Sequence, residues 1–291
     1  MSLAFSPNQD SAGRRLDVYL AHELPELSRA AIQKLCDMGK VSVNGEQVSK
    51  SGYKIRLHDQ ISVNYDQAAA DTVPAIAIPV LYEDDDCIVM DKPVGVLTHS
   101  KGAFNPEPTV ATFIASRLTD LSGERGGIVH RLDRATSGVI IAAKNTKALS
   151  ALQKQFSQRK AKKLYLAIVS GHLKQPEAII DMAIERNPKA PATFRVGVNG
   201  KSAVTQYKVI RETNRYSLLE LRPQTGRTHQ LRVHLQEIGH PIVGDVLYGG
   251  KAAPRLFLHA QSLEITLPDC SRQTFSAELP KEFTEFLDND D

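Results

Sequence analysis

The sequence predicts an α+β protein of two domains, the larger built on a mixed, largely antiparallel sheet. Its 291 residues are too many for one small domain. An alanine- and proline-rich stretch at 67–79 has the composition of a linker. After it, strand-like segments follow one another without intervening helices, which disfavours a parallel β-α-β order. We therefore expect a flexible N-terminus at 1–13, a small α+β domain at 14–66, the linker at 67–79 and the larger domain at 80–291.

The small domain has the pattern of two short helices followed by strands. Apolar residues form one helical face over 16–24, and Ser28 is placed to cap a second helix over 29–38. Residues 40–48 alternate around an Asn-Gly turn, which predicts a tight β-hairpin, and a further strand is expected at 60–65.

This order of elements, with LSRAAIQKL followed by GKVSVNG, resembles the S4 RNA-binding domain. Six basic residues stand against two acidic ones between Arg29 and Arg56. A basic helix pair beside a hairpin can hold a phosphate backbone without reading its sequence. We expect Arg29, Lys34 and Lys40 to bind RNA in this way. The alternative is a small packing domain with an ordinary charged surface.

The larger domain is expected to mix strands and helices. Strands are predicted at 88–91, 127–132, 139–143, 164–170, 178–184, 204–212, 216–222 and 263–267. Helices are predicted at 110–121, 146–159, 228–238 and 281–287.

Charge is segregated along the chain, although the net charge is only +3. Seven basic residues and no acidic one lie between Lys144 and Lys163, and ten basic residues face three acidic ones between Glu185 and Arg232. Such segregation suits a polyanionic partner held on one face. Ordinary solvated lysines give the same counts, so charge alone does not decide the partner.

Several classes of protein are disfavoured by the sequence. No apolar run approaches the roughly 20 residues of a membrane span, and the N-terminus has no apolar secretory core. Three scattered cysteines without CxxC spacing indicate a reducing cytoplasm rather than disulfides or zinc. His229, His234 and His240 do not share one helical face, so we expect no metal site. Neither a glycine-rich nucleotide loop nor a GxSxG elbow is present.

The most informative stretch, residues 126–138, has the sequence GGIVHRLDRATSG. It predicts a strand over 127–132 that enters a polar turn holding Asp133. Backbone and hydroxyl groups can fix a carboxylate there so that it faces a cleft. Taken alone, Asp133 could equally be a turn residue paired with Arg131 or Arg134.

The string HRLDRATSG resembles the motif of RluA-type (RluC- or RluD-like) RNA pseudouridine synthases, and three further segments agree with that family in order. DKPVGVLTH from Asp91 looks like its KPxG motif, KLYLAIV from Lys163 like its tyrosine strand, and PQTGRTHQLRVH from Pro223 like its GRTHQ motif. The resemblance spans about Leu81 to Leu267. It implies a catalytic domain of pseudouridine synthase type and an isomerase that converts uridine to pseudouridine in RNA. The reaction requires no redox cofactor, nucleotide or metal.

The resemblance also implies roles for individual residues. Asp133 is implied as the catalytic carboxylate, which either adds to C1′ of the ribose or removes a proton from C2′. Tyr165 is implied to stack on the uracil and is the candidate base for the C5 proton, and Arg232 is implied as the buried cation that keeps Asp133 ionised. Arg131 is implied to occupy the space of the flipped base, with Leu231 packing on that base. Further substrate contacts are expected from His130, Thr136, Arg227 and His229.

Non-functional interpretations exist for three of these residues. Without its motif, Tyr165 would be a core aromatic residue on a strand, and Arg232 would be one more arginine facing phosphate. Arg131 would be a surface arginine at the end of a strand.

Family members with an S4-like domain chiefly modify large-subunit (23S) ribosomal RNA, so we expect that substrate, with transfer RNA as the second candidate. A non-catalytic RNA clamp, such as a ribosome-assembly factor, would share the basic surface but would not need Asp133, Tyr165 and Arg232 together. A glycosidase would need a second carboxylate beside the scissile bond, and none stands out. We expect a monomer, because no apolar seam is evident.

Overall fold

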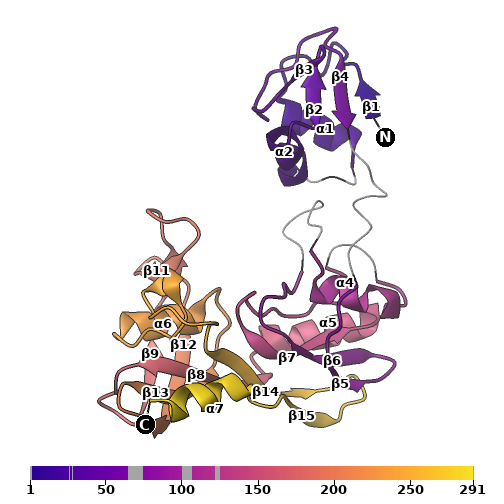
Figure 1. Ribbon diagram of the computed structural model, residues 1–291. Helices are drawn as coiled ribbons and strands as arrows, with labels where there is room; N and C mark the ends of the chain where they lie inside the picture. Colours follow the sequence, from indigo (N-terminus) through magenta and orange to yellow (C-terminus); the bar gives the residue numbers. More distant parts are fainter. Residues whose placement is uncertain are drawn as a thin grey trace. The chain divides into compact units, whose positions relative to one another are not determined.

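The computed structural model describes residues 2–25, 27, 29–64, 75–99, 107–121 and 125–290 (Figure 1). It divides into a smaller unit, which contains the chain through Ile76, and a larger unit, which contains Ala77–Thr98 and the chain from Thr109. Within these described ranges, no helix is long and apolar enough to cross a membrane. Ser28 and most of the predicted linker lie outside the described residues.

The smaller unit packs two helices and a four-stranded sheet around one apolar core. The helices are α1 (Leu16–Glu23) and α2 (Arg29–Asp37), and the strands are β1 (Ser2–Phe5), β2 (Val41–Val43), β3 (Glu46–Gln47) and β4 (Ile61–Asn64), in the order β1-β4-β2-β3. Asn44 and Gly45 both have positive φ, at 53° and 83°, as the predicted Asn-Gly hairpin turn between β2 and β3 requires.

The expectation of a flexible segment at 1–13 is wrong for its first residues. They form β1, which pairs antiparallel with β4. Leu3 and Phe5 pack against the core of the smaller unit, and that apolar contact holds the segment in place. The run SLAF is too short to be separated from an ordinary terminus by its sequence pattern.

The larger unit is built on a nine-stranded mixed sheet in the order β5-β6-β7-β14-β8-β13-β12-β9, with β15 also pairing with β14 (Figure 1). All pairs are antiparallel except β7 with β14. The strands are β5 (Val80–Glu83), β6 (Cys87–Lys92), β7 (Ser137–Ala143), β8 (Lys162–Ser170), β9 (Glu177–Asp181), β12 (Val204–Glu212), β13 (Tyr216–Pro223), β14 (Leu258–Thr266) and β15 (Arg272–Ser276). The predicted α+β class is confirmed.

Shorter elements surround this sheet. They are a hairpin of β10 (Ile184–Arg186) and β11 (Phe194–Val196), the helices α4 (Val110–Ile114), α5 (Thr146–Ser157), α6 (Gln230–Glu237) and α7 (Lys281–Asp288), and the 3-10 turns η1 (Ala115–Arg117) and η2 (Val246–Tyr248). The helix expected at 110–121 is therefore shorter than predicted, and the strand expected at 178–184 is divided between β9 and β10.

Glycine at 138 allows the parallel contact in the middle of the sheet. Gly138 has a φ of 113°, and a Cβ atom there would lie 2.2 Å from the carbonyl oxygen of Ala260 in β14. A residue with a side chain would push β7 away from β14. In the sheet, β14 lies between β7 and β8. The close packing of β7 on β14 at Gly138 therefore brings the segment before β7 nearer to β8.

Candidate active site

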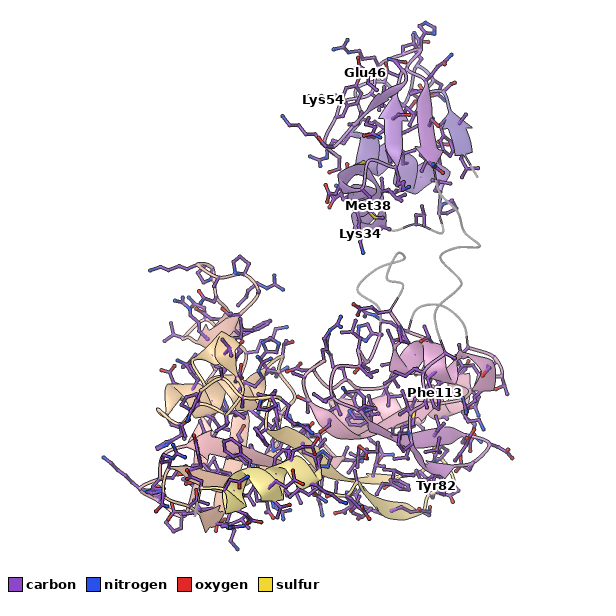
Figure 2. The ribbon with its side chains drawn as sticks, in the orientation of Figure 1. Lys34, Met38, Glu46, Lys54, Tyr82 and Phe113 are labelled. Carbon is purple, nitrogen blue, oxygen red and sulfur yellow. The ribbon has the colours of Figure 1, made fainter. Side chains whose placement is uncertain are left out.

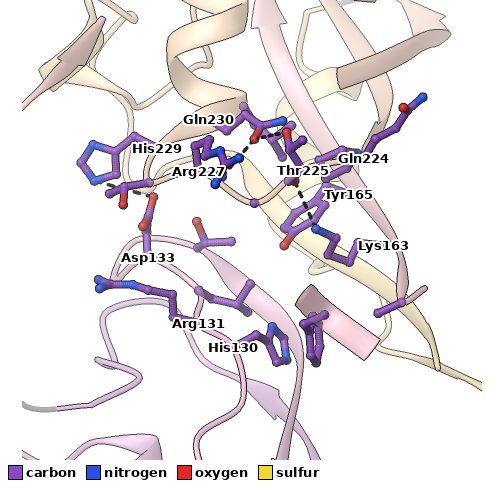
Figure 3. A pocket seen from close by; sticks show the side chains of 18 of the residues that line it. His130, Arg131, Asp133, Lys163, Tyr165, Gln224, Thr225, Arg227, His229 and Gln230 are labelled. Carbon is purple, nitrogen blue, oxygen red and sulfur yellow. Dashed lines mark hydrogen bonds and ion pairs between the residues drawn. The ribbon is translucent and has the colours of Figure 1, made fainter. Parts of the chain in front are cut away.

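A pocket of about 440 Å³ opens in the larger unit where three segments and β14 meet (Figure 3). Its lining comes from the segment that precedes β7, from the end of α5 and the start of β8, from the stretch between the end of β13 and the first turn of α6, and from Leu258 of β14. All nine residues that the sequence predicted for catalysis or substrate contact line it: Arg131, His130, Asp133, Thr136, Tyr165, Arg227, His229, Leu231 and Arg232.

The strand predicted over 127–132, in the segment before Asp133, is wrong. Only Ile128 forms a bridge, to Ala142 of β7. The ladder stops there because the next backbone N–H of β7, that of Ile141, donates to Nε2 of His130 at 3.1 Å instead of to a carbonyl group. The His130 ring also stacks on Phe156, with centroids 4.4 Å apart. His130 is thus a structural side chain of the pocket wall.

The protonation of His130 agrees with that role. Burial, and secondarily the nearby Lys163 cation, lower the pKa of His130 to about 3. The ring is therefore neutral at physiological pH, with an unprotonated Nε2 free to accept the Ile141 N–H.

Two buried residues that sequence reasoning did not assign hold the loop of Asp133. The Thr98 hydroxyl donates to the carbonyl oxygen of Leu132 at 2.9 Å and accepts its N–H at 3.2 Å. The fully buried Lys92 ammonium donates to the carbonyl oxygens of Pro93 and Val96, at 2.9 and 2.8 Å, and to that of Arg134 at 3.4 Å. Desolvation lowers the pKa of Lys92 to about 7. Both side chains come from the DKPVGVLTH segment, so the hydrogen bonds of that motif hold the backbone on either side of Asp133 in place.

The Asp133 carboxylate lies beside two basic side chains. Its Oδ2 is 3.5 Å from Nη1 of Arg232 and 3.8 Å from Nε2 of His229, and 19% of its side chain is exposed. The carboxylate is therefore open to the pocket on one side and faces cations or N–H donors on the other.

Arg232 is shared between two carboxylates. Its Nε and Nη2 donate to the two oxygens of Asp245 at 2.7 and 2.8 Å, a bidentate pair in which both side chains are buried. Its guanidinium also lies over the Tyr248 ring, 4.8 Å from the centroid. The predicted pairing with Asp133 is present but longer, and Asp245, which the sequence did not identify, is what holds Arg232 in place.

His229 occupies a strained position at the start of α6. Its φ of 56° lies in the left-handed region, which costs on the order of 1 kcal/mol for a residue with a side chain. Nδ1 hydrogen-bonds the Tyr248 hydroxyl at 2.7 Å, and the ring meets Phe194 edge-on. This geometry turns Nε2 toward Asp133 (Figure 3), and burial lowers the pKa of the His229 imidazole.

The two other histidines of this region have separate partners. His234 bonds Thr205 Oγ1 and the Met182 carbonyl oxygen, each at 2.9 Å, and His240 bonds the carbonyl oxygen of Ser170. The histidines do not converge, and in the described part of the chain no group of His, Cys, Asp or Glu is arranged to hold a metal ion.

Lys163 and Tyr165 enter the pocket from the same face of β8, since they are two residues apart on a strand. The ammonium of Lys163 donates to the carbonyl oxygen of Thr225 at 3.2 Å. Burial lowers the pKa of Lys163 to about 8. Burial, and then the negative charge of Asp133, raise the pKa of Tyr165, so Tyr165 is a neutral phenol at physiological pH.

Gln230 organises the loop that faces β8. Its Oε1 accepts the Thr225 hydroxyl at 2.7 Å and the Arg227 N–H at 3.0 Å, and its Nε2 donates to the Val204 carbonyl oxygen at 3.0 Å. Arg227 Nε donates to the carbonyl oxygen of Ser202, so this predicted substrate residue also anchors the loop. Buried Leu231 packs in the core that includes Leu258.

Charge in the pocket is one-sided. Among the described lining residues, Asp133 is the sole carboxylate, whereas the basic side chains are Arg131, Arg159, Lys163, Arg227 and Arg232. A site with this balance suits a polyanionic substrate whose reacting part meets one acidic group.

The predicted RNA-binding residues of the smaller unit differ in their surroundings. Arg29 donates to the buried Asp17 at 3.0 Å, beside Arg15 and Gln33, which bond the same carboxylate. These contacts hold the pKa of Asp17 well below its usual range, the Arg15 hydrogen bond most of all. Lys34 and Lys40 are exposed, and Lys34 points away from the sheet (Figure 2).

Two family models match the chain. The model described as RNA pseudouridylate synthase matches residues 86–237, and that of the S4 domain matches residues 14–61. These ranges contain every motif segment on which the two resemblances were based, and both resemblances are confirmed.

Curated relatives cover nearly the same span. An uncharacterized RNA pseudouridine synthase of Aquifex aeolicus is 40% identical over 247 residues, covering 82% of this chain and 78% of that protein. The ribosomal large subunit pseudouridine synthase D of Borreliella burgdorferi is 36% identical over 294 residues, covering 94% and 89%. A solved structure, human RNA pseudouridylate synthase domain containing 4, aligns with a TM-score of 0.58 at 25% identity, covering 76% of this chain and 95% of that one.

Proposed function

Because the chain belongs to the RNA pseudouridylate synthase family and isomerises uridine to pseudouridine in RNA, we propose that Asp133 starts this reaction in the pocket described above. The observation behind the proposal is that Asp133 is the sole carboxylate among the described lining residues. Arg232 and His229 lie 3.5 and 3.8 Å from its Oδ2.

The proposed reaction begins with a uridine that leaves its stack and enters the pocket. Asp133 adds to C1′ or removes the C2′ proton, and the N1–C1′ bond breaks. The base then turns and C5 bonds to C1′, while Asp133 leaves C1′ or returns its proton to C2′. The C5 proton then leaves and N1 gains a proton. Arg131, exposed at the pocket rim, occupies the space that the base has vacated in the RNA.

Tyr165 is proposed to stack on the uracil. Its raised pKa means that no phenolate is present before substrate binds, so a second role as the base for the C5 proton requires that the phenol lose its proton during the cycle.

We propose large-subunit (23S) ribosomal RNA as the substrate. Support comes from relatives named ribosomal large subunit pseudouridine synthase D, at 36% identity in Borreliella burgdorferi and in Xylella fastidiosa, and from the S4 domain. A substrate of this kind would be met in the cytoplasm. Transfer RNA is the alternative.

Mapping pseudouridine in cells that lack this chain tests the substrate. We expect specific uridines of large-subunit RNA to remain unmodified and to regain pseudouridine when the wild-type chain, but not Asp133→Asn, is restored. If pseudouridine were lost only from transfer RNA, then transfer RNA, and not ribosomal RNA, would be the substrate.

The smaller unit is proposed to hold RNA phosphates through Lys34 and Lys40. Replacing both with glutamine should weaken RNA binding and reduce the slope of log affinity against log salt by about 0.7–0.9 per lost contact. Arg29 is left in place because it pairs with Asp17. The double variant Lys174→Gln, Lys281→Gln removes two exposed lysines of the larger unit and controls for net charge. If the slope of log affinity against log salt were the same for the two double variants, Lys34 and Lys40 would not be the residues that hold RNA phosphates.

A further inference from the structure

We propose that the ammonium group of Lys163 donates a hydrogen bond to a carbonyl oxygen of the flipped uracil and stabilises the uracil anion that forms when the N1–C1′ bond breaks. The inference rests on the proposed function of the pocket. It places a positive charge at the end of the pocket where the uracil is proposed to bind.

The position of Lys163 fits this role. It lies two residues before Tyr165 on β8, and the two side chains line the pocket together (Figure 3). If Tyr165 stacks on the uracil, the Lys163 ammonium is placed near the edge of the same base. Gly226 lies beside the ammonium: a Cβ atom added there would be 3.6 Å from Nζ, an ordinary van der Waals contact, so glycine at this position leaves that side of Nζ without a covering side chain.

Lys163 also has unused donors. An ammonium group has three N–H bonds, and among the residues that the structure describes that of Lys163 makes one hydrogen bond, to the carbonyl oxygen of Thr225. No carboxylate of the described chain forms a salt bridge with it. An enclosed cation that is not neutralised favours a negatively charged ligand at that point.

The other basic groups of the pocket are less suited to this task. Arg232 is held by Asp245 in a bidentate pair and lies beside Asp133, so it serves the carboxylate. The His130 ring is neutral and accepts from Ile141. Arg227 bonds the Ser202 carbonyl oxygen. Arg131 and Arg159 are exposed to solvent. Lys163 is therefore the partly buried cation that is placed to act on the base rather than on the sugar end.

The reaction needs such a cation on either route. When the N1–C1′ bond breaks, its electron pair stays on the base, and the negative charge spreads over N1, O2 and O4. C1′ is meanwhile bonded to the Asp133 oxygen, or joined to C2′ by a double bond after Asp133 has taken the C2′ proton. C5 then bonds to C1′, which releases the Asp133 carboxylate from C1′ or, on the other route, is accompanied by return of the proton from Asp133 to C2′. The C5 proton then leaves and N1 takes up a proton, which gives the neutral base of pseudouridine. A preplaced cation in a water-poor site stabilises a charge of this kind strongly.

Two substitutions at one position test the role. Lys163→Met should lower the single-turnover rate of isomerisation by about 100-fold or more while RNA affinity stays near that of wild type. Lys163→Arg should retain much of the rate, because the guanidinium keeps the charge. The burial-lowered pKa of about 8 predicts that the wild-type rate falls as pH rises through this value, since the ammonium loses its proton. The arginine variant should not show this fall.

A modified substrate separates an electronic role from a structural one. Fluorine at C5 withdraws electrons and makes the base a better leaving group, so the loss of Lys163 should slow glycosidic cleavage of 5-fluorouridine RNA less than that of uridine RNA. Thermal unfolding shows whether the methionine variant folds. If it does not fold, the pH profile of the arginine variant tests the role of Lys163 instead.

Three results would overturn the proposal: a methionine variant as fast as wild type, an alkaline fall unchanged in the arginine variant, or the same penalty with both substrates. Asp133→Asn keeps the two proposals distinguishable. If it is inactive while Lys163→Met is fully active, only the inference about Lys163 fails; if it is active, the proposed function fails.

Discussion

Replacing Asp133 with asparagine is expected to abolish isomerisation while leaving RNA affinity close to that of wild type. The amide has the shape of the carboxylate and can stay beside Arg232 and His229, but it neither adds to C1′ nor accepts the C2′ proton. The expected loss of rate is about 10⁴-fold, the upper range for removing an essential acid–base group. We propose that RNA is held mainly through basic side chains such as Lys34 and Lys40, which this change does not touch.

The comparison requires rate, affinity and stability for the same preparations. Asp269→Asn changes an exposed aspartate of the larger unit in the same chemical way and should be fully active. If Asp133→Asn converted uridine at a comparable rate, Asp133 would not be the catalytic carboxylate.

Replacing Arg232 with methionine should have the second largest effect and should lower both activity and stability. Arg232 and Asp245 are 8% and 2% exposed, so the substitution leaves a buried carboxylate without its bidentate partner. Breaking a buried pair in this way costs about 3–5 kcal/mol of unfolding free energy. Asp133 also loses its cation, and we expect the isomerisation rate to fall at least about 100-fold.

A double variant separates the two effects. In Arg232→Met, Asp245→Leu no buried charge remains unpaired, so denaturant unfolding should show that much of the lost stability returns. Activity should remain low, because Asp133 still lacks Arg232. Recovery of activity together with stability would mean that Arg232 acts only as scaffold.

Much of the fold follows from local sequence. The helical face over 16–24 became α1, and the Asn44-Gly45 turn formed because few other residue pairs adopt positive φ twice in succession. The strands β6, β8, β12 and β13 followed from alternating or continuous apolar runs bounded by turn residues. These signals act over a few residues, which is why a single sequence is enough to find them.

The predictions that were wrong concern elements whose formation depends on contacts between distant segments of the chain. The strand expected over 127–132 does not form because one imidazole, that of His130, takes the amide of Ile141. The strand β1 forms only because β4, about sixty residues later in the chain, offers it an edge. Neither contact leaves a pattern in the local sequence.

The candidate site also contains residues that the sequence predicts and residues that only their contacts reveal. Its nine predicted residues came from motif resemblance, and they meet because β14 inserts between β7 and β8, an order that no local pattern predicts. Asp245, Lys92 and Thr98 were not assigned because their importance lies in what they bond: a guanidinium, three carbonyl groups and the backbone of Leu132. A buried aspartate or lysine looks like a surface residue until its partners are known.

The most direct test of the central claim is tritium release from uridine labelled at C5, in ribosomal and transfer RNA made in cells that lack this chain. Isomerisation expels the C5 hydrogen. We expect the wild-type chain to release tritium from the ribosomal fraction and Asp133→Asn, although it binds the same RNA, to release none. Release by Asp133→Asn at the wild-type rate, or no release by the wild-type chain from either fraction, would contradict it.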